Sequence, residues 1–258
     1  MNKSFLPPRE VLRKILDDQD FFLWQYYGKS LLGKIQAWIF RSRIGVIVRF
    51  LRKTGSNLGT ILDVGCGPMF ISYALTNKMN EYVGVDVMSD ASLKRYKDAM
   101  NNAGVTSLHV VRTSAEYLPF RNGSFDFVLC LDVLEHLSKP RQAILEIYRV
   151  LKDGGLIAIS LPLENFIQKL LRIGFILMKI GGDTMLRRTR HIPITRTPEY
   201  HYVGDIKSYS EMIKALKEFL NFIQTKYTPV GFHKLINVNA IHIAEKRPYR
   251  YKDSSKLC

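Results

Sequence analysis

The chain has 258 residues, 47% of them hydrophobic and 24% charged, which excludes a disordered or collagen-like protein and suits one α/β domain with additions. Its three cysteines, Cys66, Cys130 and Cys258, share no metal-ligand spacing, so we expect no disulfide framework, no metal site and a reducing, cytoplasmic location. Met1–Pro8 is short, polar and proline-containing, unlike a signal peptide. The longest apolar stretch, Leu170–Ile180, is shorter than the about 20 residues that cross a bilayer.

The net charge of +15 is spread unevenly along the chain. Residues 1–58 contain 11 lysines and arginines against 4 acids, whereas residues 59–163 contain 10 against 11, so the excess lies in the flanks. An acidic partner, such as phosphate, nucleic acid or anionic lipid headgroups, is one interpretation of these flanks. A uniformly basic, solvated surface is the other.

Residues 1–58 have helical patterns, and we expect them to form an N-terminal helical cap. In the stretch 31–53, Lys34, Arg41, Arg49 and Arg52 recur at intervals of 7, 8 and 3, which places them on one narrow side of a helix. Most other positions in the stretch are apolar. The pattern predicts an amphipathic helix that is basic on one side and packed on the other.

Residues 59–163 alternate between two periodicities. Short β-branched runs predict strands at Thr60–Val64, Tyr82–Asp86, Leu108–Val111, Phe125–Leu131 and Leu156–Leu161. Helical spacing between several of them predicts helices at Pro68–Lys78, at Ser89–Asn102 with Ser89 as the N-cap, and at Lys139–Leu151. Because strand–helix–strand crossovers are right-handed, this order predicts a parallel, doubly wound, Rossmann-like α/β sheet.

Residues 164–208 interrupt this rhythm and are interpreted as an inserted lid. Polar residues of Asn165–Ile180 fall on one stripe, the rest is apolar, and three arginines follow at positions 187, 188 and 190. Such a helix buries its apolar face in the core, over a substrate pocket or in a membrane interface. Residues 209–258 then predict a helix at Tyr209–Leu220 and strands near Phe222–Pro229 and Ile236–Ala244.

The first predicted strand is followed by the motif that carries chemistry, Asp-Val-Gly-Cys-Gly beginning at Asp63. Gly65 and Gly67 let the backbone approach a ligand closely, and the helix that follows offers unpaired N–H groups. A nicotinamide or flavin site would want a third glycine at position 70, where the chain has Phe70. Asp86 ends the second strand, where a carboxylate can accept two hydrogen bonds from a ribose diol.

Four further motifs follow in order, at Thr113–Phe120, Ser124–Val128, Leu131–Leu137 and Arg149–Gly155. With the glycine turn they resemble the class I S-adenosylmethionine-dependent methyltransferases, specifically the type 11 small-molecule group, over Thr60–Pro162. The resemblance implies a seven-stranded sheet with the last strand antiparallel and S-adenosyl-L-methionine as cofactor.

The resemblance also assigns roles to residues. Asp63 shapes the glycine loop beside the methionine moiety, Asp86 holds the ribose and Val87 contacts the adenine. The whole cofactor-binding set comprises Asp63, Gly65, Gly67, Asp86, Val87, Ser114, Ala115, Leu131 and Asp132. Two positions depart from the pattern: Met69 replaces the third glycine of the family motif, and Ser114 replaces an aspartate that accepts from the adenine amino group. Both suggest altered affinity for the cofactor.

Three other sites have two interpretations each. His136 follows the fourth strand and is either a general base or a structural histidine at the turn. Tyr200, His201 and Tyr202 end the insertion and either line an acceptor pocket or belong to a solvated loop. Cys130 lies within the fourth strand and is either a nucleophile or a core residue, and we expect it in the core.

The sequence therefore predicts methyl transfer from S-adenosylmethionine to a small, apolar or lipid-like acceptor, with peripheral contact to an anionic membrane. One alternative is an RNA methyltransferase, which the basic flanks favour and the absence of an Asn/Asp-Pro-Pro-aromatic motif opposes. Another is a non-catalytic S-adenosylmethionine-binding regulatory subunit. The oligomeric state is left open.

Overall fold

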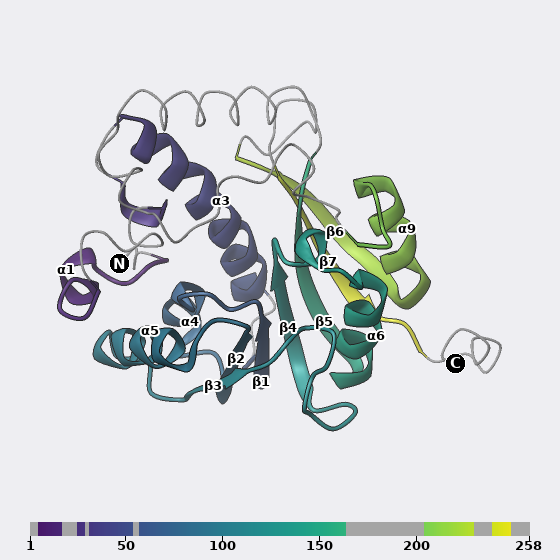
Figure 1. The fold of residues 1–258 in the computed structure, drawn as a ribbon, viewed down its shortest axis with the longest axis horizontal. Helices are drawn as coiled ribbons and strands as arrows, with labels where there is room; N and C mark the ends of the chain where they lie inside the picture. Colours follow the sequence, from purple (N-terminus) through teal and green to yellow (C-terminus); the bar gives the residue numbers. More distant parts are fainter. Residues whose placement is uncertain are drawn as a thin grey trace.

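The computed structural model describes residues 5–16, 25–28, 31–53, 57–163, 204–229 and 239–248. Their strands form one seven-stranded sheet in the order β3-β2-β1-β4-β5-β7-β6 (Figure 1). β7 is antiparallel to both of its neighbours, and the pairs among the first five strands are parallel. The strands are β1 (Thr60–Val64), β2 (Glu81–Asp86), β3 (Leu108–Arg112), β4 (Phe125–Leu131), β5 (Leu151–Pro162), β6 (Leu220–Thr228) and β7 (Asn239–Lys246).

Helices cover both faces of the sheet, as the doubly wound prediction requires (Figure 1). One face carries α3 (Leu31–Lys53), α4 (Phe70–Leu75) and α5 (Asp90–Asn102), and the other carries α6 (Pro140–Val150) and α9 (Tyr209–Phe219). The short helices α1 (Arg9–Leu12) and η1 (Leu134–His136) complete the described elements. The predicted fold class is confirmed.

Each face of the sheet packs its own hydrophobic core. Neighbouring residues of a strand point to opposite faces, so Ile61 joins the core under α3, α4 and α5, whereas Leu62 joins the core under α6 and α9. Cys130 is fully buried in the second core, as predicted, and burial raises the pKa of its thiol well above the ordinary value. Burial on both faces explains the near-continuous apolar sequence of the central strands.

Local capping sets several helix boundaries. Ser89 accepts a hydrogen bond from the Ser92 amide at 3.3 Å and begins α5 as predicted, and Ser208 does the same for α9. The predicted start of the fifth strand at Leu156 is wrong. β5 begins at Leu151 because Leu151 pairs with Phe125 beyond an irregularity in the β4–β5 register, and α6 therefore ends at Val150.

The amphipathic helix predicted at residues 31–53 is present as α3, with its four predicted basic residues exposed. The predicted lid helix Asn165–Ile180, the arginines after it and Tyr200, His201 and Tyr202 lie outside the described residues. The division into a cap, a core, a lid and a C-terminal segment stays a prediction. None of the helices in the described part of the chain is long and apolar enough to cross a membrane.

Candidate functional site

The glycine turn lies at the carboxyl edge of the parallel strands. The amides of Gly65 and Cys66 donate to the carbonyl of Val85 in β2, at 2.8 and 3.0 Å. Gly65 and Gly67 both have positive φ, 67° and 48°, which other residues rarely adopt. A Cβ at Gly65 would also lie 2.3 Å from Val133 Cγ2, so Gly65 is required by the fold itself as well as by any ligand.

Asp86 connects this turn to the loop that follows β2. Its Oδ2 accepts from the Gly67 amide at 3.0 Å, and its Oδ1 accepts from the Met88 amide at 3.1 Å. A carboxylate offers about four lone-pair directions, so two amides leave capacity for two hydroxyl donors. The next residue, Val87, is 67% exposed and presents an apolar surface beside that carboxylate. The pair suits a ribose diol and the face of a base.

Met69, the predicted departure from the glycine pattern, caps α4 in the left-handed conformation with φ 56°. Its side chain is buried, and it packs beneath β2: a Cβ at Gly84 would lie 3.0 Å from the Met69 sulfur and 2.8 Å from the Cys66 sulfur. The missing side chain of Gly84 thus makes room for Met69. The bulkier residue fills the core instead of the turn.

Asp63 lies beneath the turn, almost fully buried, and its carboxylate accepts a short hydrogen bond from the Tyr82 hydroxyl. Burial raises the pKa of Asp63 to about 7, the hydrogen bond from Tyr82 partly offsets this rise, and the charge of Asp86 adds to it. Asp63 is therefore held by Tyr82 of β2 and does not face solvent, and its role in shaping the glycine loop stays a prediction.

The loop after β3 is tied to the same edge. The Thr113 amide donates to the Asp86 carbonyl at 3.0 Å, and Ser114 Oγ accepts from the Glu116 amide at 3.3 Å. Glu116 in turn accepts from the Lys139 amide at 2.7 Å, at the start of α6. Ala115 is buried behind this loop. The hydrogen bond of Thr113 holds the start of the loop that contains Ser114 and Ala115 at the end of β2, and their contact with the adenine edge stays a prediction.

At the end of β4, Asp132 adopts φ 56° directly after Leu131 and gathers three partners. Its carboxylate pairs with Arg43 of α3, accepts from Ser160 of β5 and accepts from Asn239 Nδ2 of β7 at 3.0 Å. We call these four residues the Asp132 cluster. It joins the ends of three strands and α3 at one point beside the glycine turn.

Sequence reasoning missed two charged residues here, Arg43 and Glu135. Arg43 is 6% exposed, and burial lowers the pKa of its guanidinium while the Tyr26 hydroxyl and Glu135 oppose the change. Glu135 is fully buried, and no other residue in the described part of the chain donates a hydrogen bond to its carboxylate. Burial raises its pKa to about 8 despite its own amide and the charge of Arg43. The sequence did contain a signal for Arg43: it is the one basic residue of α3 that the helical repeat places on the side opposite the other lysines and arginines.

His136, the predicted base, follows Glu135 with its side chain 32% exposed, and its Nε2 lies 3.9 Å from Glu135 Oε1. The histidine is thus accessible at the same edge as Asp132, next to a buried acid. Within the described residues, no group of three His, Cys, Asp or Glu side chains is arranged to hold a metal ion.

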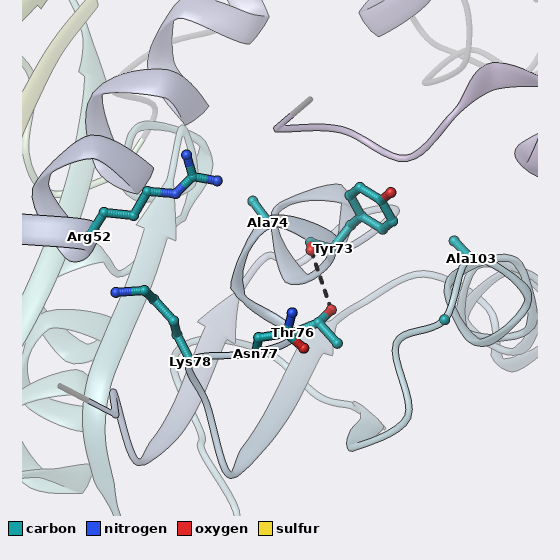
Figure 2. A pocket seen from close by; sticks show the side chains of 8 residues that line it. Arg52, Tyr73, Ala74, Thr76, Asn77, Lys78 and Ala103 are labelled. Atoms are coloured by element: carbon teal, nitrogen blue, oxygen red, sulfur yellow. Dashed lines mark hydrogen bonds between the residues drawn. The ribbon is translucent and has the colours of Figure 1, made fainter. Parts of the chain in front are cut away.

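One hollow has a volume of about 360 Å³, and Figure 2 shows the side chains that line it. Its lining includes Arg52, Thr76, Lys78 and Ala103, which come from the ends of α3, α4 and α5. Along the chain these helix ends come just before the first residues of β1, β2 and β3, so the hollow lies at the amino ends of the strands. Asp86 lies at the opposite, carboxyl end of β2. Ligands of open α/β sheets bind outside the carboxyl ends of strands, so this hollow is not the cofactor site.

The strand order, the glycine turn and the carboxylate that ends β2 define a class I methyltransferase fold. Residues 62–159 match the family model for the type 11 methyltransferase domain. Residues 62–159 therefore form a domain of the class I S-adenosylmethionine-dependent methyltransferase type, a class whose cofactor is S-adenosylmethionine.

Relatives and solved structures agree with this assignment. A ubiquinone biosynthesis O-methyltransferase of Pseudomonas paraeruginosa is 33% identical over 101 residues, which are 39% of this chain and 43% of that protein. An uncharacterized methyltransferase of Mycobacterium sp. strain KMS is 39% identical over 39% of this chain and 38% of its own length. The match thus spans about two fifths of these relatives.

Likeness in three dimensions extends further along the chain. The N-methyltransferase NodS of Bradyrhizobium japonicum, solved with S-adenosyl-L-homocysteine, has a TM-score of 0.58 at 14% identity and covers 95% of this chain and 100% of its own. The YcgJ protein of Bacillus subtilis has a TM-score of 0.55 at 19% identity, with 81% of this chain and 99% of its own covered. At these identities the likeness concerns the fold.

Proposed function

We propose that the protein transfers the methyl group of S-adenosylmethionine to a small acceptor at the carboxyl edge of the sheet. The observation that carries this proposal is Asp86, whose carboxylate holds the glycine turn by one amide and keeps acceptor capacity beside the exposed Val87. Gly65 and Gly67 would border the methionine moiety, Ser114 and Ala115 the adenine edge, and Leu131 and Asp132 the floor.

The bound cofactor supplies an activated sulfonium methyl, so the protein's contribution is to position the acceptor. A base is needed only for an acceptor that arrives protonated. We assign that role to His136, which is accessible at this edge. The Asp132 cluster fixes the end of β4 on which the acceptor would rest, because three partners hold its carboxylate.

We further propose an apolar or lipid-like acceptor that is methylated on oxygen. Two of the relatives are named ubiquinone biosynthesis O-methyltransferases, which supports an oxygen acceptor. The basic composition of the flanks supports peripheral contact with an anionic membrane. Tyr200, His201 and Tyr202 are proposed to line the acceptor pocket.

Cell extract incubated with the protein and a methyl-labelled donor tests this function. Label should enter the lipid or small-molecule fraction, and S-adenosylhomocysteine should form in proportion. His136→Gln should lower turnover at neutral pH, whereas His109→Gln, which alters an exposed histidine on β3, should leave it unchanged. Label found in RNA instead would identify a nucleic-acid enzyme, and the absence of any turnover across all fractions would leave only a cofactor-binding subunit.

A further inference from the structure

The outward side of α3 carries positive charge and no negative charge. Its exposed charged residues are Lys34, Arg41, Arg49, Arg52 and Lys53, and residues 31–53 contain no aspartate or glutamate. At roughly 100° per residue, these five cations fall within a sector of about 120°. The opposite side holds the fully buried Ile47 and Leu51.

Two large apolar side chains lie within the same sector. Trp38 is 53% exposed and Ile35 is 40% exposed, although both lie between the cations. An open groove of about 520 Å³ runs beside Trp38, with Phe5, Tyr27 and Gly45 also in its lining. The exposed surface of α3 is therefore both cationic and apolar, and we call it the α3 outer face.

The cations of this face have no acidic partners in the described part of the chain. Arg41 lies over the ring of Tyr27 at 4.9 Å and Arg52 over the ring of Phe5 at 5.1 Å, contacts that orient the guanidinium groups without neutralising them. Other helices differ: on α5, Lys94 pairs with Asp98 at 2.7 Å. The unbalanced charge is thus a property of α3 and not of every surface helix.

The helix also projects past the tips of β1 and β4, at the edge where Asp86 and Asp132 lie (Figure 1). Arg43, on the inner side of the same helix, pairs with Asp132. A surface that holds the α3 outer face would therefore be separated from the edge of the sheet at which we place methyl transfer by the width of one helix, about 10 Å.

We propose that the α3 outer face docks the protein onto an anionic lipid surface. An interfacial helix combines cations with aromatic and aliphatic side chains on its exposed side, and each basic residue near such a surface contributes about fivefold in binding. Ile35 favours lipid over nucleic acid, because a nucleic acid can stack on Trp38 but gains little from an exposed aliphatic chain. The inference rests on the peripheral membrane contact proposed above and names its surface; it does not require turnover.

Co-sedimentation of the full chain with vesicles tests the docking. Vesicles of phosphatidylcholine with about one third phosphatidylglycerol should bind the protein, pure phosphatidylcholine should not, and salt should weaken binding. The double variant Lys34→Gln/Arg49→Gln should weaken binding about 25-fold. The matched control Lys94→Gln/Lys214→Gln removes the same charge from α5 and α9 and should change it less than threefold.

The apolar part has its own pair of variants. Trp38→Ala should weaken vesicle binding about tenfold, as expected for losing a large half-buried side chain from the interface. Tyr117→Ala removes a similarly exposed aromatic elsewhere, 61% exposed, and should leave binding unchanged. Every variant is checked by circular dichroism and by its affinity for S-adenosylhomocysteine, which these surface changes should not alter.

Equal losses in the α3 and control variants would overturn the proposal, since net charge alone would then explain the binding. Absence of binding to anionic vesicles at low salt, or binding of single-stranded RNA by this face in place of vesicles, would overturn it too. Loss of vesicle binding with S-adenosylhomocysteine affinity intact leaves the proposed methyl transfer standing. If Trp38→Ala fails to fold, the two charge variants decide the question.

Discussion

Replacing Asp86 by alanine removes the carboxylate that we assign to the ribose of S-adenosylmethionine. That carboxylate also accepts from the amides of Gly67 and Met88, at 3.0 and 3.1 Å. The substitution therefore acts in two ways: the ligand loses its hydrogen-bond acceptors, and the glycine turn loses its link to the loop after β2.

The size of the effect follows from the bonds lost. Hydrogen bonds to a charged acceptor contribute about 1.5–3 kcal/mol, which corresponds to a roughly ten- to hundredfold weaker affinity. Asp86→Asn keeps the shape and one acceptor oxygen, but its amino group faces an N–H donor. We expect its affinity to lie between those of the wild type and Asp86→Ala.

Calorimetric titration with S-adenosylhomocysteine measures these affinities. Asp90→Ala is the matched control, because Asp90 is an exposed carboxylate at the start of α5 that pairs only at 3.8 Å with Arg112. It removes a nearby negative charge without touching the turn and should leave affinity within twofold. Unchanged affinity of a folded Asp86→Ala protein would refute the assignment of the ribose site and, with it, our placement of the cofactor.

Three further predictions concern stability. Burial raises the pKa of Glu135 to about 8, so the folded protein keeps a proton on this carboxyl that the unfolded chain loses above about pH 4.5. Between these pH values the free energy of unfolding should therefore fall as pH rises, by at most about 1.4 kcal/mol per pH unit. Glu135→Gln should flatten this slope in urea titrations between pH 7 and 8, a range that lies above the pKa of about 7 of the other buried acid, Asp63. An unchanged slope would contradict the assignment. Arg43→Met and Asp132→Asn should each cost roughly 3 kcal/mol, and the double variant less than their sum, because the second change removes a charge already left unpaired; strict additivity in chemical denaturation would argue against the ion pair. Met69→Gly relieves a left-handed backbone but empties a buried site, so thermal unfolding should show a net loss of about 1–3 kcal/mol, and a gain would mean that the side chain packs poorly.

The sequence by itself determined which segments of the core form strands and helices and that their sheet is doubly wound, and its resemblance to a known family implied the cofactor. Period-two and period-3.6 patterns are local. Asp63 and Asp86 lie at the carboxyl ends of their strands and Gly65 and Gly67 follow β1, so parallel pairing brings them to one edge. The cationic side of α3 was also predictable from the sequence, because the helical repeat alone places Lys34, Arg41, Arg49 and Arg52 on one side.

Only the tertiary structure decided what meets across long distances in the chain. Arg43 and Asn239 reach Asp132 from the two ends of the sequence, and no local pattern pairs residues so far apart. Met69 is tolerated because Gly84, on the neighbouring strand, leaves space for its side chain. The pKa of Glu135 rises because packing from several elements removes water from its carboxylate, and this environment exists only once the chain has folded.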